Sequence, residues 1–238
     1  MKVGAFAALR VAIMLLPQGA QYWAWLILAL GTVNVVYGAL IAMVQTDFKY
    51  VIGFSSVSHM GLVLIGFATL SREGLLGSGM QMFSHGVMTA LFFSIVGMVY
   101  DRAHTRDISK LGGLFQKMPW ATIGFIVGGL VSMGMPGFSG FVAEFPVFMG
   151  AWRAAPWVAI IAVLGILVTA AYIFLVIRRV FFGEIPSELL KVDDVTVMDK
   201  IAIGLLVATM IGLGLFPSLL STMIQTGVNH VLSLLGGA

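Results

Sequence analysis

Five ionisable side chains lie inside apolar stretches of this sequence. They are Lys2, Arg10, His59, His85 and Glu144. A charge at the centre of a bilayer costs roughly 3 kcal/mol or more, so each of these groups needs a partner or a function. Carboxylates, lysines and histidines are also the side chains that bind and release protons in relays. Their positions therefore indicate proton transfer inside a membrane.

Glu144 is the only acid away from the ends of an apolar run, and its run covers residues 118–152. Pro136 and two nearby glycines interrupt this run, so we expect two half-helices joined by an extended piece near Met135–Gly140. The freed backbone groups need protein or water as partners. A broken helix with a buried carboxylate is typical of a transporter. The alternative is a simple proline kink whose glutamate is bonded to a neighbouring hydroxyl.

A polar stripe follows one face of the apolar segment 75–100. Gln81, His85 and Thr89 recur at four-residue intervals, and Ser84 lies beside them. His85 falls near the middle of the span, where a ring that can donate and accept suits a proton relay. A neutral histidine bonded to a carbonyl or a serine explains the same spacing equally well.

Ser55, Ser58 and His59 share a face of the segment 50–70. Their hydroxyls and ring could hold ordered water beside a relay. Serine also permits helices to pack closely, and this structural interpretation is the favoured one.

The first apolar stretch, residues 3–16, is too short to cross about 30 Å of hydrocarbon. It resembles a signal peptide in its basic start, but Arg10 argues against that interpretation. We therefore expect it to be the latter part of a spanning helix, from a polypeptide that extends beyond Met1. Lys2 would then lie deep in the membrane and could supply protons to a relay, whereas Arg10 would reach for the interface. The alternative for Lys2 is a basic residue at a chain start.

The composition excludes several classes of protein. Sixty per cent of the 238 residues are hydrophobic, 10% are charged and cysteine is absent. The mean hydropathy of +1.05 is that of an integral membrane protein. Without cysteine, this chain supplies no disulfide, thiolate metal site or iron–sulfur ligand. We find no nucleotide-binding glycine loop, no metal-ligand spacing and no catalytic triad, and we expect no cofactor or metal in this chain.

Seven apolar runs predict an all-α integral membrane protein with about six complete crossings and one partial crossing, one helix being broken at Pro136–Gly140. We expect a helical membrane unit at 1–182, a loop at 183–200, and a last helix with an amphipathic tail at 201–238, the tail lying along the membrane surface. The runs cover residues 3–16, 23–44, 50–70, 75–100, 119–152, 156–182 and 199–216.

Basic residues are distributed unequally between alternate loops. One set of loops carries nine of them and the other carries two, which predicts that the first set faces the cytoplasm. The nine are Lys49, Arg102, Arg106, Lys110, Lys117, Arg178, Arg179, Lys191 and Lys200, and the two are Arg72 and Arg153.

Four motifs in this order resemble the antiporter-like membrane subunits of respiratory complex I (NADH-quinone oxidoreductase), most closely their NuoM/NdhD type. The motifs are QTDFKYVIGFSSVSHMG at 45–61, QMFSHG at 81–86, HTRD at 104–107, and GMPG with FVAEF at 134–145. The resemblance extends from residue 1 to about residue 183 and is weaker beyond it.

The resemblance implies a fourteen-helix fold with two inverted repeats, of which this chain would hold the end of the eighth helix, the second repeat and the last helix. By position, Lys2 is similar to the family's eighth-helix lysine, His85 to its eleventh-helix histidine and Glu144 to the glutamate of its broken twelfth helix. The first seven helices, with their glutamate and lysine, have no counterpart here.

The resemblance predicts a proton-translocating subunit of a quinone-reducing complex in a bacterial-type inner membrane. Its expected partners are other complex I membrane subunits and lipid, and we expect it to bind neither nucleic acid nor a soluble substrate. Electron transfer would take place in other chains. The alternatives are a subunit of an Mrp-type sodium/proton antiporter or of a membrane-bound hydrogenase, which share this fold, and a purely structural membrane subunit, for which buried charges would be unnecessary.

Overall fold

A computed structural model describes residues 1–236, and its regular elements are helices. Residues 237 and 238, at the end of the predicted segment 201–238, lie outside this description. The long elements are α1 (Lys2–Ala7) with the π-helix η1 (Ala8–Leu15), α2 (Pro17–Val44), α3 (Phe48–Ala68), α4 (Arg72–Ala103), α5 (Pro119–Ser132), α6 (Ser139–Ala154), α7 (Pro156–Val176) with the π-helix η4 (Ile177–Phe181), α8 (Val197–Leu215) and α9 (Ser218–Leu234). Short 3-10 turns are η2 (Ile108–Lys110), η3 (Leu114–Gln116) and η5 (Ser187–Leu189).

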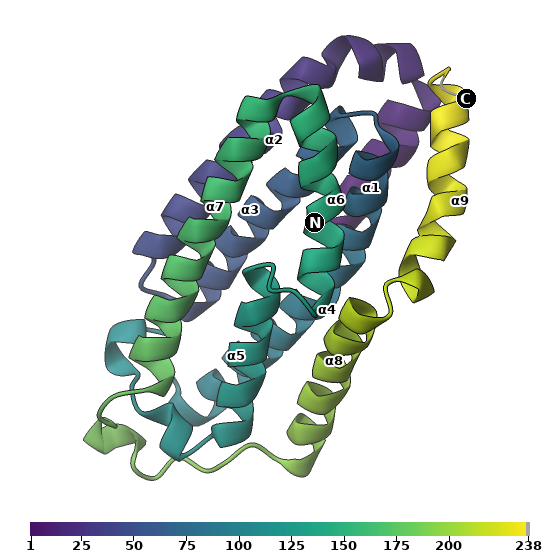
Figure 1. The fold of residues 1–238 in the computed structure, drawn as a ribbon. Coiled ribbons are helices and arrows are strands. Elements are labelled where there is room, and N and C mark those ends of the chain that lie inside the picture. The colour runs from purple at the N-terminus through teal and green to yellow at the C-terminus, as the bar shows by residue number, and fades with distance from the viewer. Residues whose placement is uncertain (237–238) are drawn as a thin grey trace.

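Five helices are long and apolar enough to cross a membrane: α2, α3, α4, α7 with η4, and α8. The 14 residues of α5 extend only about 21 Å. With α6 it forms the predicted broken helix, which supplies the sixth crossing. The all-helical membrane fold predicted from the sequence is thus confirmed, and the helices run side by side as one elongated bundle (Figure 1).

Local sequence explains where the helices begin. The Asp47 side chain accepts hydrogen bonds from two backbone amides at the start of α3, and the Ser71 side chain accepts one at the start of α4. Thr196 and Asp199 form a reciprocal capping box on α8. Helices α2, α5 and α7 each begin at a proline, whose missing amide hydrogen costs nothing at a first helical position.

The three loops rich in basic residues lie together at one end of the bundle, which we call the basic end (Figure 1, from the left edge to the bottom). Backbone hydrogen bonds join them: Phe48 donates to Arg106 at 2.8 Å, and Gly113 donates to Phe182 at 3.2 Å. The ion pair between Arg102 and Asp199 (3.1 Å) ties the start of α8 to the end of α4. The clustering agrees with the predicted topology, in which these loops share one side.

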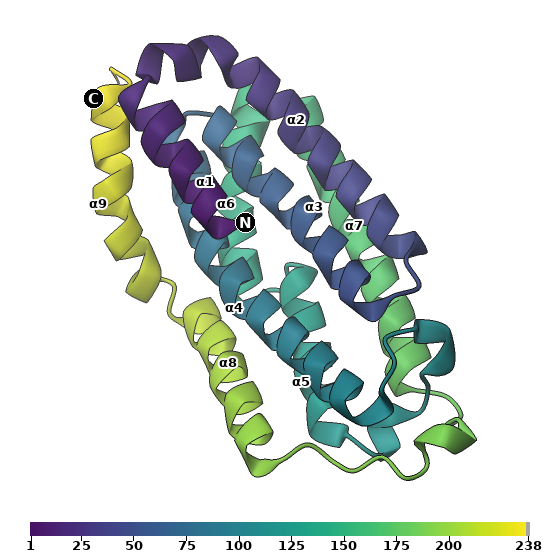
Figure 2. The ribbon, with the colours of Figure 1, turned by 180° about the vertical axis from the view of Figure 1, so that it is seen from behind.

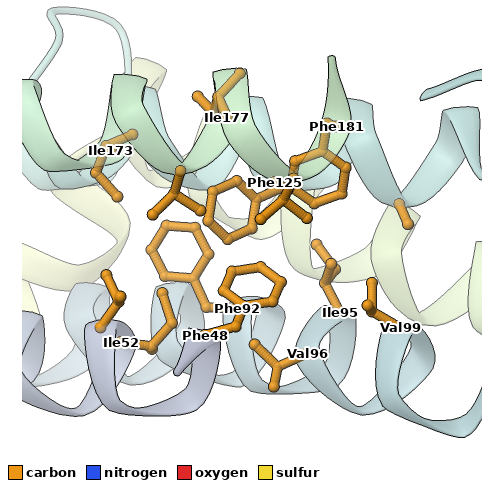
Figure 3. Close-up of a cluster of buried hydrophobic side chains, with 14 of the residues drawn as sticks. Phe48, Ile52, Phe92, Ile95, Val96, Val99, Phe125, Ile173, Ile177 and Phe181 are labelled. Carbon is orange, nitrogen blue, oxygen red and sulfur yellow. The ribbon is translucent and has the colours of Figure 1, made fainter. Parts of the chain in front are cut away.

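An aromatic core fills the bundle near the basic end. Phe48, Phe92, Phe125 and Phe181 come from four different helices and are fully buried, and aliphatic side chains of α4 and α7 surround them (Figure 3). The Phe125 ring lies 4.7 Å from Phe92 and 5.1 Å from Phe181, between ring centroids. Rings at such separations attract one another beyond the gain from burying their area.

Helix α9 does not lie across the end of the bundle, as a tail along the membrane surface would. It continues from α8 along the side of the bundle and packs beside α4 and η1 (Figure 2). Its apolar stripe includes Val228 and Val231, which are buried in a cluster with Ile13 and Leu75. The expectation of a surface helix was therefore wrong, because this stripe finds its apolar partner within the protein.

Candidate functional site

The break between α5 and α6 covers residues 133–138. Gly134 and Gly137 adopt positive φ angles of 65° and 93°, which explains why glycine stands at both positions. Gly140 lies just inside α6, not in the break as its position suggested. A β-carbon there would lie 2.1 Å from the carbonyl oxygen of Val131, so this glycine lets the two half-helices approach closely.

Glu144 lies beyond the first turn of α6 and is 2% exposed. Its Oε1 atom accepts a hydrogen bond from the Gln81 amide at 2.9 Å and lies 3.1 Å from Nδ1 of His59. Its Oε2 atom has no hydrogen-bond partner among residues 1–236. One oxygen is thus held by α3 and α4, and the other can take part in exchange.

His59 links Glu144 to the end of α5. Its Nε2 atom lies 2.9 Å from the Ser132 hydroxyl, while Nδ1 faces the carboxylate. With Glu144 ionised, Nδ1 carries the hydrogen and donates it, and Nε2 accepts from Ser132. A proton taken up at Nε2 can then be matched by a proton released from Nδ1 to Glu144. This buried ring, 3% exposed, has the geometry of a relay.

His85 lies next to this pair on α4. Its ring centroid is 5.3 Å from that of His59, and neither of its nitrogens has a hydrogen-bond partner among the described residues. Thr89 donates to the His85 carbonyl at 2.6 Å, and the Lys2 ammonium donates to the Thr89 hydroxyl at 3.1 Å. The structure therefore brings Lys2, His85 and Glu144 into one polar layer, with His59 between the two last.

The remaining predicted polar residues divide into two groups. Ser84 bonds Ser139 at the start of α6 (2.8 Å), and Ser55 accepts from the Tyr172 hydroxyl (2.7 Å), so both belong to the polar layer. Ser58 instead donates to the Val35 carbonyl of α2 at 2.9 Å. Its hydroxyl thus helps to pack α3 against α2, which is the structural interpretation that the sequence favoured for this face.

Sequence reasoning missed three members of this layer: Ser132, Ser139 and Tyr172. The two serines flank the helix break at its edges, and that position was the available signal. Tyr172 lies in a run of apolar residues without any polar spacing, so nothing in the sequence singled it out. All three are at most 4% exposed.

A cavity of about 120 Å³ lies beside Glu144. Its lining includes Gly134 of the helix break, Phe141 and Phe145 of α6, and Ile166 of α7. Phe145 is half exposed, so the cavity lies close to the outer surface of the bundle. No cluster of three or more potential metal-ligating side chains occurs within residues 1–236. The chemistry that this geometry supports is proton exchange by the carboxylate.

Comparison with known sequences gives one consistent family. The family model described as NADH:quinone oxidoreductase/Mrp antiporter, TM, matches residues 1–169. The chain is 38% identical over 232 residues to NADH-quinone oxidoreductase subunit M of Rhodobacter capsulatus, a match that covers 97% of this chain and 45% of that protein. It is 35% identical over 245 residues to NAD(P)H-quinone oxidoreductase chain 4 2 of Synechococcus sp. (strain JA-3-3Ab), covering 99% of this chain and 46% of that one. The chain thus spans about half the length of these curated relatives.

Solved structures show the same fold. A chain of respiratory complex I from Thermus thermophilus superposes with a TM-score of 0.92 at 32% identity, over 99% of this chain and 50% of that chain. A chain of the Mrp complex from Dietzia sp. superposes with a TM-score of 0.87 at 19% identity, over 98% of this chain and 51% of that chain, and this likeness shows the fold alone.

Proposed function

Because this multi-pass membrane chain belongs to the family of NADH:quinone oxidoreductase and Mrp antiporter membrane subunits, we propose that it conducts protons as part of a proton-translocating NADH-quinone oxidoreductase. The observation that carries the proposal is the buried carboxylate of Glu144, which is held by His59 and Gln81 beside a helix break. A purely structural subunit would have no use for such a group.

The proton pathway that we propose uses Lys2, His85, His59 and Glu144. Glu144 accepts a proton from Nδ1 of His59 on Oε1, and rotation of the carboxyl group then turns the protonated oxygen towards the cavity beside Phe141 and Phe145, where the proton is released. His85 and Lys2 continue the path along α1 and α4. Ser55, Ser84, Gln81 and Thr89 orient these groups or hold water between them.

The redox reaction belongs, in this proposal, to other subunits of the complex. Quinone reduction there would change the proton affinity of this polar layer through the neighbouring membrane subunits, which we propose as its partners along with the lipid bilayer. Relatives named for NADH-quinone oxidoreduction at 35–38% identity favour this assignment over an Mrp-type antiporter. If inactivating this subunit abolished a sodium-dependent proton transport, the result would instead favour the antiporter.

We further propose that the membrane is a bacterial plasma membrane and that the basic end faces the cytoplasm. The bacterial relatives and the unequal distribution of basic residues support this. A cysteine in place of Lys110 should react with an impermeant thiol reagent from the cytoplasmic side, and one in place of Arg72 from the other side. The opposite pattern would reverse the topology.

The decisive experiment replaces Glu144 in the assembled complex and measures proton pumping in reconstituted vesicles. Glu144→Gln keeps the size of the side chain and a hydrogen-bonding oxygen but cannot exchange a proton, so we expect normal assembly and impaired pumping. Glu144→Asp should retain part of the activity. Glu184→Gln, at an exposed acid of a loop, is the matched control. Wild-type pumping in Glu144→Gln would refute the role, and failed assembly would indicate a structural ion pair instead.

A further inference from the structure

A cavity of about 290 Å³ lies where η1, α4 and α9 meet, on the side of the bundle along which α9 runs (Figure 2, left). Most of its lining is apolar and includes Leu9 and Met14 of η1, Met82 of α4 and Met223 of α9. It shares no residue with the polar layer around Glu144. Such a lining matches the acyl chain of a lipid, which is as apolar as leucine, better than it matches a polar ligand.

Two polar side chains, Arg10 of η1 and His230 of α9, also line this cavity. The guanidinium carbon of Arg10 lies 5.9 Å from the centroid of the Phe6 ring, and its Nη1 atom lies 3.7 Å from the sulfur of Met14. Phe6 and Met14 line the cavity as well, so the charge of Arg10 stands at the cavity itself. Within residues 1–236, Arg10 forms no ion pair with a carboxylate. A cationic group in an apolar setting with only a thioether and a ring beside it calls for an anion from another molecule.

The cavity lies in the half of the bundle that is remote from the basic end. There η1 leads through Leu16 into the start of α2, and Gln21 of α2 donates a hydrogen bond to the carbonyl of Leu235, just past the end of α9, at 3.0 Å. Arg10 and His230 fall within about one helical turn of the ends of η1 and α9. An arginine so close to a helix end extends its guanidinium to the headgroup region of the bilayer. In the proposed topology both side chains therefore lie at the level of the phosphate groups of the outer leaflet.

We propose that this cavity binds an anionic phospholipid of the outer leaflet, with the phosphate held by Arg10 and His230 and part of one acyl chain lying between η1, α4 and α9. The planar guanidinium donates two parallel N–H groups to phosphate oxygens, and the imidazole donates a third. A lipid with net negative charge is preferred, because a zwitterionic headgroup carries its own ammonium beside the phosphate and so weakens the attraction to Arg10. This binding requires the membrane location of the chain but not proton conduction.

The first test compares two photoreactive phospholipids in vesicles that contain the assembled complex. Both carry the same acyl chains with a diazirine, and one has an anionic glycerol headgroup and the other a zwitterionic choline headgroup. We expect the anionic probe to label η1 and α9 at the cavity, and Arg10→Gln to reduce this labelling roughly tenfold because the charge-assisted hydrogen bonds are lost. Arg72→Gln is the control, since Arg72 is an exposed arginine at the start of α4 that does not line the cavity. Equal labelling by the two probes, or unchanged labelling in Arg10→Gln, would overturn the proposal.

The second test fills the cavity with protein. Gly227 of α9 lines it, and no atom lies within 4 Å of a β-carbon built there, so Gly227→Leu introduces a side chain into the space of the acyl chain without a clash of its β-carbon. We expect labelling by the anionic probe to be lost while the complex assembles normally. Gly204→Leu, at an equally open glycine of α8 away from the cavity, should keep the labelling. Persistent labelling in Gly227→Leu would overturn the proposal.

Other occupants of the cavity are detected from the protein side. Met223 lines the cavity and is 76% exposed, so a photoreactive amino acid in its place reports what lies there in the assembled complex. We expect it to crosslink to phospholipid. A crosslink to a polypeptide instead would show that another segment or subunit covers the cavity, and the lipid site would be refuted. Neither this readout nor the labelling depends on proton pumping, so a failure here leaves the proposed function untouched.

Discussion

Phe125 and Glu144 are buried to nearly the same degree, at 0% and 2% exposure, but their surroundings differ. Phe125 lies among three other phenylalanine rings, and the cluster that contains it is apolar except for the Tyr172 hydroxyl, which is bonded to Ser55 (Figure 3). Glu144 lies among histidine, glutamine and serine side chains, and several polar atoms in this layer have no partner within residues 1–236. One region is fully packed, and the other keeps unused hydrogen-bonding capacity.

The difference shows how the bundle separates stability from transport. Burial of aromatic side chains supplies packing energy near the basic end and excludes water from it. An unpartnered buried polar atom costs about 1–3 kcal/mol, so the polar layer lowers stability where it stands. A protein can keep such a layer only where another region compensates for it, and here the two regions are adjacent along α4.

The largest effect on stability is expected for Phe125→Ala. Removing a buried phenylalanine from a close-packed core typically costs about 3–5 kcal/mol. We expect poor accumulation of the subunit in the membrane and a lower midpoint of unfolding in detergent. Phe174→Ala, at a phenylalanine of α7 that is 59% exposed, is the matched control and should accumulate normally. Equal effects of the two substitutions would show that the aromatic core is not the stabilising region.

Gly140→Ala should disturb both regions at once. The new methyl group would meet the Val131 carbonyl at 2.1 Å, and forcing the half-helices apart costs about 1–3 kcal/mol. Since α6 carries Glu144, the same movement should draw the carboxylate away from His59 and impair pumping. Gly97→Ala is the control, because no atom lies within 4 Å of a β-carbon built at that position of α4. Normal pumping in Gly140→Ala would show that the site tolerates movement of α6.

The broken helix could be predicted because its cause is local. Proline and glycine impose their backbone preferences wherever they occur, so Pro136 and Gly137 marked the break without knowledge of any neighbour. The four-residue spacing of Gln81, His85 and Thr89 likewise fixed a face of α4. The individual partners could not be predicted, because they depend on how helices approach one another.

Ser58 and His59 illustrate this limit. A β-carbon at Gly38 of α2 would lie 2.6 Å from the backbone nitrogen of Ser58, so this glycine lets α2 approach α3 closely and brings Val35 within reach of the Ser58 hydroxyl. His59, one residue further, turns towards α6 and meets Glu144. Adjacent residues thus have different partners, and the close approach that determines the partner of Ser58 depends on a glycine of another helix.

His85→Leu should separate stability from proton transport. Leucine has a similar size, and the imidazole nitrogens have no hydrogen-bond partner to lose within residues 1–236. We therefore expect the free energy of unfolding to change by less than about 1 kcal/mol. Pumping should slow moderately, because the ring next to His59 would be gone while Gln81 and Thr89 remain. His85→Gln, which keeps a polar group, should retain more activity. A destabilised His85→Leu protein would mean that the ring has a structural partner.

The smallest effect is expected at the basic end, where Asp107 closes the loop between α4 and α5. Its carboxylate accepts hydrogen bonds from the Ser109 hydroxyl at 2.7 Å and from the Ser109 amide at 3.0 Å, and these bonds hold the pKa of Asp107 below its ordinary value. A lowered pKa in the folded state stabilises the protein at pH values above the ordinary carboxyl pKa of about 3.9, and this stabilisation is lost as pH falls through the folded-state pKa.

Asp107→Asn keeps an accepting oxygen and loses only the charge, so its unfolding midpoint should be slightly lower than wild type at pH 7 and equal to it in strong acid. Asp107→Ala loses the acceptor as well and should show a larger deficit at pH 7. Proton pumping should be unchanged in Asp107→Asn, since the loop lies outside the polar layer, and a pumping defect would extend the functional region to the basic end.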